Sequence, residues 1–134
     1  MKDIILLIFI FYYGNCYSLE LKPVVVLQKD GLNFNCSMPF DGQVLEFESK
    51  NKGAFKVSGN IKVSTGPISL AMWCSVNGKY HFSRIPTLQN INADENEKEF
   101  SIPFDAGDQT VDSIALVLTT NGSGSCIIRN ISVE

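Results

Sequence analysis

The sequence predicts an all-β domain folded as an antiparallel two-sheet β-sandwich. Apolar and polar residues alternate in short segments, which is the pattern of strands with one buried face and one solvated face. Glycine, proline, asparagine and aspartate separate these segments at short intervals, as turns do. No stretch of useful length repeats its apolar residues with the helical period. Because each half-apolar sheet must cover its buried face, two packed sheets are the expected arrangement.

The expected strands differ in how clearly they are marked. Residues 55–64 carry the longest alternation, and Gly59 in its middle predicts a bulge or a close approach of another backbone. Asn77-Gly78 is the strongest two-residue hairpin signal of the chain. Residues 105–112 are polar and are expected to form a loop. The expected strands are 21–28, 32–36, 43–49, 55–64, 69–76, 79–84, 99–104, 114–118 and 126–133.

Trp73 is the only tryptophan of the chain, and it lies on the polar side of its expected strand. The inward phase of that strand holds Leu70, Met72, Cys74 and Val76, whereas Trp73 shares the outward phase with Ser69, Ala71 and Ser75. Burying a tryptophan side chain contributes a few kcal/mol, so a ligand or another layer of the protein is expected to cover it. The second possibility is packing under the N-terminal segment or a loop.

The first residues have the layout of a secretory signal peptide, expected to span residues 1–18, with the domain covering 19–134. One lysine precedes an apolar run over 4–13, which would rise only about 15 Å as a helix and is too short to span a membrane. Cleavage is expected after Ser18. Cleavage after Cys16 and acylation of Cys16 are alternatives. The mature protein is therefore expected to be secreted or extracytoplasmic.

Composition and motifs exclude several function classes. The chain has 134 residues and a net charge of −3, which argues against a nucleic-acid partner because phosphate binding needs a basic face. A lone histidine and the lack of a Cys-x-x-Cys pair predict no metal site, and no cofactor is expected. No Gly-x-Ser-x-Gly elbow occurs. The acidic residues Asp94, Glu95, Glu97 and Glu99 are interpreted as a solvated loop rather than as hydrolytic carboxylates, so the protein is not expected to be an enzyme.

Cys36, Cys74 and Cys126 follow the expected cleavage site. In an oxidising compartment, three cysteines allow one disulfide and one free thiol, and the sequence leaves the pairing open. A Cys74–Cys126 bridge is the preferred prediction, and the alternative is that all three are small buried residues. Three Asn-x-Ser acceptors for glycosylation begin at Asn35, Asn121 and Asn130; Asn121, in an expected turn, is the preferred one.

From residue 53 to residue 134, the order of strands and turns resembles the jelly-roll carbohydrate-binding modules and related galactose-binding-domain-like β-sandwiches. The resemblance is carried by 55–63, 99–104, 113–118 and 124–133. It implies a jelly roll that binds carbohydrate or a glycoconjugate on aromatic and polar side chains of one sheet. Such modules commonly hold a structural calcium ion, but Asn35, Arg129 and Asn130 stand where acidic residues are usual, so no calcium is expected.

The resemblance makes Trp73 the leading candidate for sugar binding, with Tyr80 and His81 on the paired hairpin strand as neighbours. Lys56, Asn60 and Lys62 are further candidates if their strand pairs with the Trp73 strand. The predicted function is that of an exported, non-catalytic binding module whose expected ligand is carbohydrate. The alternative is a secreted structural or protein-interaction β-sandwich that does not bind sugar, in which case a packed layer would cover Trp73.

Overall fold

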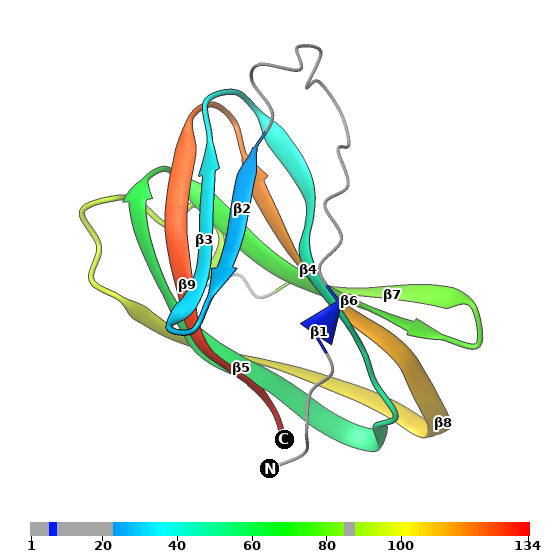
Figure 1. Ribbon diagram of the computed structural model, residues 1–134. Coiled ribbons are helices and arrows are strands. Elements are labelled where there is room, and N and C mark those ends of the chain that lie inside the picture. The colour runs from blue at the N-terminus through cyan, green and yellow to red at the C-terminus, as the bar shows by residue number, and fades with distance from the viewer. Residues whose placement is uncertain (1–5, 8–22, 85–87) are drawn as a thin grey trace.

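The fold is built from antiparallel strands in two sheets (Figure 1). The computed structural model describes residues 6–7, 23–84 and 88–134. The strands are β1 (Leu6–Leu7), β2 (Val24–Gln28), β3 (Gly31–Cys36), β4 (Phe40–Glu48), β5 (Lys52–Thr65), β6 (Ile68–Val76), β7 (Lys79–Arg84), β8 (Lys98–Thr120) and β9 (Gly124–Val133).

One long strand, β8, belongs to both sheets. Its first part pairs with β5 in sheet B, which continues through β9 and β3 to β2. Its second part lies between β4 and β6 in sheet A, which ends with β7 on one side and β1 on the other. The side-by-side course of β5 and β8 is visible in the lower half of Figure 1. The prediction of an antiparallel two-sheet jelly-roll sandwich is confirmed.

The inward faces of the two sheets form a single core. Sheet B contributes Phe34, Val57 and Ile61, and sheet A contributes Leu70 and Leu116, all at most 2% exposed. The alternating pattern of β5 in the sequence corresponds to alternating buried and more exposed residues in the structure. In β6, the residues that the sequence predicts to face inward, from Leu70 to Val76 in alternation, are all buried.

The polar segment 105–112 is not the separate loop that we predicted. It continues β8, with a register shift opposite β5 between the pairs Ala54–Asp105 and Lys52–Thr110. The Val111 amide donates to the Asn51 carbonyl at 2.9 Å, and the Ser49 amide donates to the Asp112 carbonyl at 3.1 Å. These hydrogen bonds hold residues 111–112 in β8, while Gly107 takes a positive φ angle of 62° in the part that bulges away from β5.

The structure has both a bulge and a close backbone approach at Gly59, the two features that its position in the sequence predicts. The pairing of β5 with β9 shifts register between Ser58 and Asn60. A Cβ atom at Gly59 would lie 2.7 Å from the Phe100 ring and 2.9 Å from the Arg129 carbonyl oxygen. Only glycine fits this close approach without displacing a neighbour.

The cysteines do not form the predicted Cys74–Cys126 disulfide. Cys36, Cys74 and Cys126 are all buried with free thiols. Cys74 lies opposite Ile114 in sheet A, whereas Cys126 lies opposite Phe34 in sheet B, so both serve as small core residues. Burial keeps water away from the two sulfur atoms and so disfavours the charged thiolate. This raises the pKa of the Cys74 and Cys126 thiols to about 12.

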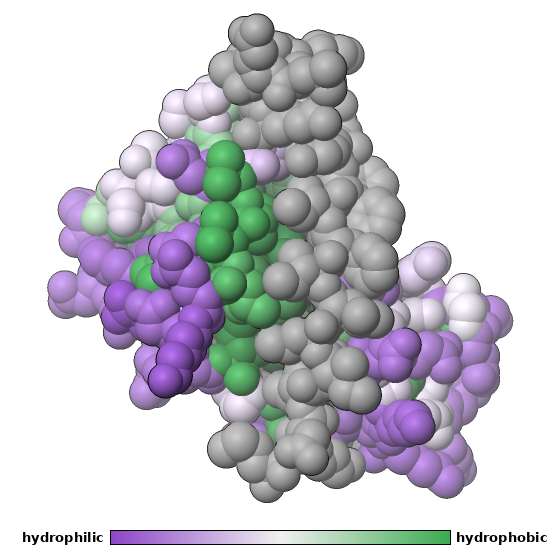
Figure 2. Space-filling model, in the orientation of Figure 1, coloured by the Kyte–Doolittle hydropathy of each residue, from purple (hydrophilic) through white to green (hydrophobic). Residues whose placement is uncertain are grey.

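β2 presents apolar side chains at the end of sheet B. Val24 and Val26 are 58% and 42% exposed, and Figure 2 shows hydrophobic residues gathered over this strand. Within the described ranges β2 pairs with β3 alone. This edge is a surface where another strand could add.

The predicted signal peptide, residues 1–18, lies outside the described residues except for β1. That strand contributes two residue pairs to the β4 edge of sheet A, Leu6 with Phe47 and Leu7 with Glu46. In the described part of the chain, we find no helix with the length and apolar character needed to cross a membrane.

Replacing Gly59 by alanine is expected to destabilise the domain by about 1–3 kcal/mol, because the added methyl group must displace Phe100 or the backbone of β9. Urea unfolding of the 19–134 domain measures this loss. The control is Gly122→Ala, where an added Cβ meets nothing within 4 Å. Equal midpoints for the two variants would contradict the close approach.

The buried thiols are expected to resist modification in the folded domain because the reactive species is the thiolate. A thiol reagent at neutral pH should react slowly with the native 19–134 domain and titrate three thiols after denaturation without reductant. The Cys74→Ala variant should titrate one fewer. A single thiol in the denatured wild-type domain would reveal a disulfide and overturn this assignment.

Candidate functional site

Four strands of sheet A align their outward side chains in rows across the sheet. β8 is flanked by β4 and β6, and β7 follows β6. Because directly opposed residues of antiparallel strands point to the same face, the register defines each row. The rows are Asp41–Thr119–Ser69, Gln43–Val117–Ala71, Glu46–Ala115–Trp73–Phe82 and Glu48–Ser113–Ser75–Tyr80.

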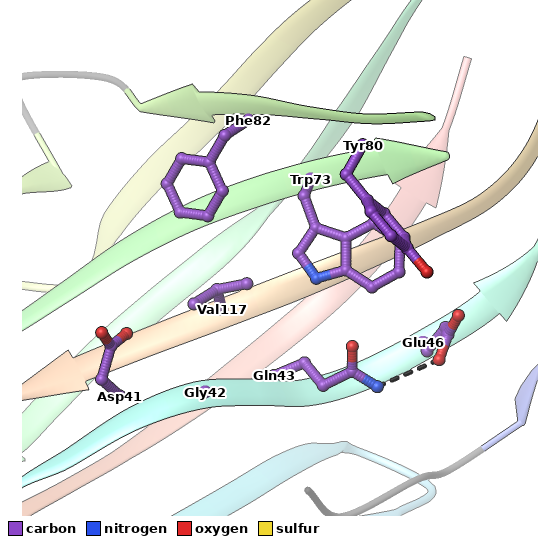
Figure 3. Close-up of a pocket in the computed structure, with 8 residues that line it drawn as sticks. All are labelled: Asp41, Gly42, Gln43, Glu46, Trp73, Tyr80, Phe82 and Val117. Atoms are coloured by element: carbon purple, nitrogen blue, oxygen red, sulfur yellow. Dashed lines mark hydrogen bonds between the residues drawn. The ribbon is translucent and has the colours of Figure 1, made fainter. Parts of the chain in front are cut away.

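A groove of about 670 Å³ lies on this face. Figure 3 shows Trp73, Tyr80 and Phe82 on the β6–β7 side and Gln43 and Glu46 on the β4 side, with Val117 between them. The outward residues of β8 are small, and Ala115 is fully buried beneath its neighbours. Small side chains on the central strand between larger ones on both flanks therefore create the hollow.

The β6–β7 hairpin builds the aromatic wall. Asn77 and Gly78 adopt positive φ angles of 51° and 77°, which suits a two-residue hairpin turn, so this sequence prediction is confirmed. The turn places Phe82 opposite Trp73. Tyr80 meets Trp73 edge to face, with centroids 4.9 Å apart and planes at 88°. Trp73 is half-buried, whereas Tyr80 is 74% exposed and Phe82 is 55% exposed.

The β4 strand supplies the polar wall. The Gln43 amide nitrogen donates to a Glu46 carboxylate oxygen at 3.0 Å, as the dashed line in Figure 3 marks. The Thr119 hydroxyl donates to the Asp41 carboxylate at 3.1 Å. A register shift between Gln43 and Leu45 brings Gln43 and Glu46 to the same face. Hydrogen-bond donors and acceptors therefore face exposed aromatic rings across a shallow floor.

Of the two predicted neighbours of Trp73 on the hairpin strand, the structure brings only Tyr80 onto its face. His81 stands opposite Cys74, on the other phase, and its ring contacts Phe104 at 5.8 Å between centroids. Placing His81 with Trp73 is therefore wrong. Phe82 occupies that position, and the two-residue turn was the signal that could have identified it, since the turn fixes the Trp73–Phe82 register.

The other predicted ligand-binding residues lie on a different sheet. Lys56, Asn60 and Lys62 belong to β5, which pairs with β8 and β9 rather than with β6. We expected these residues beside Trp73 only if β5 paired with β6. The two strands do not pair, because the chain crosses from one sheet to the other after Thr65. The sequence predictions also missed Asp41, Gln43 and Glu46, which reach the groove through long-range pairing of β4 with β8.

Two of the acidic residues near 94–99, Glu95 and Glu97, have polar partners, and those of Glu95 make it unsuited to acid catalysis. The Asn92 amide donates to the Glu95 carboxylate at 2.6 Å, and Lys98 lies 3.0 Å from the same carboxylate. These contacts lower the pKa of Glu95, the Asn92 hydrogen bond having the largest effect. A general acid needs the opposite shift. Glu97 pairs with Arg129 at 3.7 Å.

Asn121 is exposed in the turn after β8, as predicted, and Asn35 and Asn130 are exposed as well. Both of these asparagines lie on strands, with their side chains on the exposed side. Within the described ranges, no three histidine, cysteine, aspartate or glutamate side chains gather into a group that could hold a metal ion.

Sequence comparisons and structural comparisons give different results. No protein-family model matches the sequence, and no curated protein matches it. Solved structures do match the fold. The CBM22-1 xylan-binding domain of Xyn10C from Paenibacillus barcinonensis superimposes with a TM-score of 0.58 at 11% identity, covering 87% of this chain and 82% of that domain.

Two further structures extend this likeness. The CBM22-1–GH10 modules of endo-1,4-beta-D-xylanase 10B from Clostridium thermocellum, complexed with xylohexaose, match with a TM-score of 0.56 at 16% identity, over 87% of this chain and 25% of that longer one. A family 16 carbohydrate-binding module matches with a TM-score of 0.50 at 11% identity, over 88% of this chain and 87% of the module. The chain thus has the fold of the jelly-roll carbohydrate-binding modules, as the sequence resemblance predicts.

Proposed function

We propose that this protein is an exported, non-catalytic binding module whose groove on sheet A receives carbohydrate. The observation that carries the proposal is the exposed aromatic wall of Trp73, Tyr80 and Phe82 facing the polar side chains of β4. An aromatic ring offers its face to the C–H groups of a sugar ring. A carboxylate accepts hydrogen bonds from sugar hydroxyls, and a side-chain amide both donates and accepts. The groove presents both kinds of group within one hollow.

The dimensions favour a chain of sugars over a single one. From the Asp41 row to the Tyr80 row, β8 advances from Thr119 to Ser113, about 20 Å at the usual rise of a strand. The groove volume of about 670 Å³ lies in the range of small-molecule sites. An open groove of this length accommodates several units of an oligosaccharide lying along β8.

A structural or protein-interaction module is the second candidate. The exposed valines of β2 favour it, since an edge strand with apolar side chains can pair with a strand of another protein. The exposure of Tyr80 and Phe82 favours the carbohydrate function, because a surface sealed by a packed layer would bury these rings. The two functions use different sheets, so both can be tested separately.

Replacing Trp73 by alanine is expected to weaken oligosaccharide binding about five- to hundredfold, since losing a stacked aromatic ring costs about 1–3 kcal/mol. Glycan-array screening of the 19–134 domain, followed by calorimetry on the best ligand, measures this change. The control is Asn60→Ala on sheet B, which should bind like the wild type. Equal affinity of the Trp73 variant and the wild type would refute the groove as the binding site.

We also propose that residues 1–18 direct export and are removed, which places the first mature residue at Leu19. Mass spectrometry of the protein collected outside the cytoplasm of an expressing host should give the mass of 19–134. A start at Tyr17 would move the cleavage site to Cys16, and a lipid-modified Cys16 would replace release by anchoring. Retention of the full-length chain in the cytoplasm would contradict export.

A further inference from the structure

The two walls of the groove differ in charge as well as in shape. Asp41 and Glu46 line the β4 side, whereas aromatic rings line the other side. Among the described side chains that line the groove, none is basic. Arg84 stands in register with Ala71, one row from Phe82 at the end of β7. The described lining is therefore acidic and aromatic.

The carboxylates of the groove are held by neutral donors. Glu46 accepts from the Gln43 amide, and Asp41 accepts from the Thr119 hydroxyl. Three acids elsewhere pair with cations: Glu95 with Lys98, Glu97 with Arg129, and Glu134 with Lys56. None of the ion pairs found among the described residues involves Asp41 or Glu46. Among the described residues, these two carboxylates thus bond only to neutral groups at the edge of the groove.

The aromatic wall reinforces this preference for positive charge. The face of an aromatic ring attracts a cation, most strongly for tryptophan, and perpendicular rings can surround it. Trp73 and Tyr80 stand at 88° to each other, and Phe82 lies beside Trp73 in the same row. Glu46 and Trp73 both line the groove, two strands apart in one row that crosses the buried Ala115. Two strand spacings are about 10 Å, so one ligand group can meet both walls.

We propose that the groove selects glycans that carry a positive charge, namely amino sugars with a free, protonated amine. This proposal rests on the proposed carbohydrate function and specifies its ligand class. The ammonium group lies between the Trp73 and Tyr80 rings and the Glu46 carboxylate, while neighbouring sugar rings lie along β8. Asp41 attracts a further amine at the other end of the groove. The same charges disfavour uronate-containing or sulfated glycans.

Matched hexasaccharides test the ligand class. Calorimetry of the 19–134 domain at low salt compares a β-1,4-linked glucosamine hexamer, its N-acetylated form, cellohexaose and an oligogalacturonate. The glucosamine hexamer is expected to bind about three- to tenfold more tightly than cellohexaose, which has a hydroxyl in place of the amine. This advantage should shrink as salt rises, because part of it is electrostatic attraction in a solvated groove.

Two variants assign the preference to the groove. Glu46→Gln and the double variant Asp41→Asn/Glu46→Gln are expected to reduce the advantage of the glucosamine hexamer stepwise towards unity, while cellohexaose binding stays near that of the wild type. The matched control, Glu99→Gln, removes the same charge from an exposed position of β8 in sheet B and should keep the full advantage. Thermal unfolding of each variant verifies that it is folded.

The possible outcomes separate this inference from the function on which it rests. Equal binding of the amine and hydroxyl hexamers overturns the inference and leaves carbohydrate binding in place. Tighter binding of the oligogalacturonate, or an amine preference that persists in the double variant, also overturns the inference. Absence of binding to all four hexamers and across a glycan array refutes the carbohydrate function and the inference together.

Discussion

The pairing of β8 with three other strands is the constraint on which the rest of the structure depends. Its first part closes sheet B beside β5, and its second part forms the centre of sheet A between β4 and β6. In sheet A its inward residues Ile114, Leu116 and Leu118 are fully buried in the core. Their burial fixes the phase of the strand, so Ala115 and Val117 must point to the outer face.

The groove follows from that phase. A central strand with small outward side chains, flanked by strands with larger ones, leaves a hollow whose floor is backbone and methyl groups. The alternation of β6 independently places Trp73 outward, because Met72 and Cys74 occupy the core side. Sheet register then aligns Glu46, Ala115 and Trp73 in one row. The same hydrogen-bond ladder therefore both stabilises the sheet and positions the candidate ligand-binding side chains.

The sequence was informative where a single strand or a tight turn decides the outcome. Alternation identified the buried faces of β5 and β6, Asn77-Gly78 identified the hairpin, and Gly59 identified the close approach to β9. It failed where distant segments meet. Pairing of β4 with β8 brings Glu46 to the groove across a long separation in sequence, and no local pattern marks that contact. For the same reason β5 and β6, though consecutive, lie in different sheets.

The predicted disulfide and the predicted polar loop failed for a related reason. The alternation of β6 shows that Cys74 faces inward, but it does not show which inward residue lies opposite. Cys126 lies on the other sheet, beside Phe34. Polar composition indicated that residues 105–112 are exposed, which is correct for most of them, but exposure does not determine backbone conformation. The hydrogen bonds from and to residues 49–51 hold residues 111–112 in β8.

The outer faces of the two sheets carry polar residues with different roles. On sheet B, Lys56 pairs with Glu134, and the backbones of the two residues exchange hydrogen bonds, so this contact holds Glu134 against β5. Lys62 donates to the carbonyl of Glu95 and holds the acidic segment against β5. These lysines therefore have intramolecular partners. On sheet A, the described partners of the Asp41 and Glu46 carboxylates are neutral groups, and the Tyr80 and Phe82 rings beside them remain exposed to solvent. Carboxylates held by neutral donors and exposed aromatic rings occur together on this face, and a ligand can contact both.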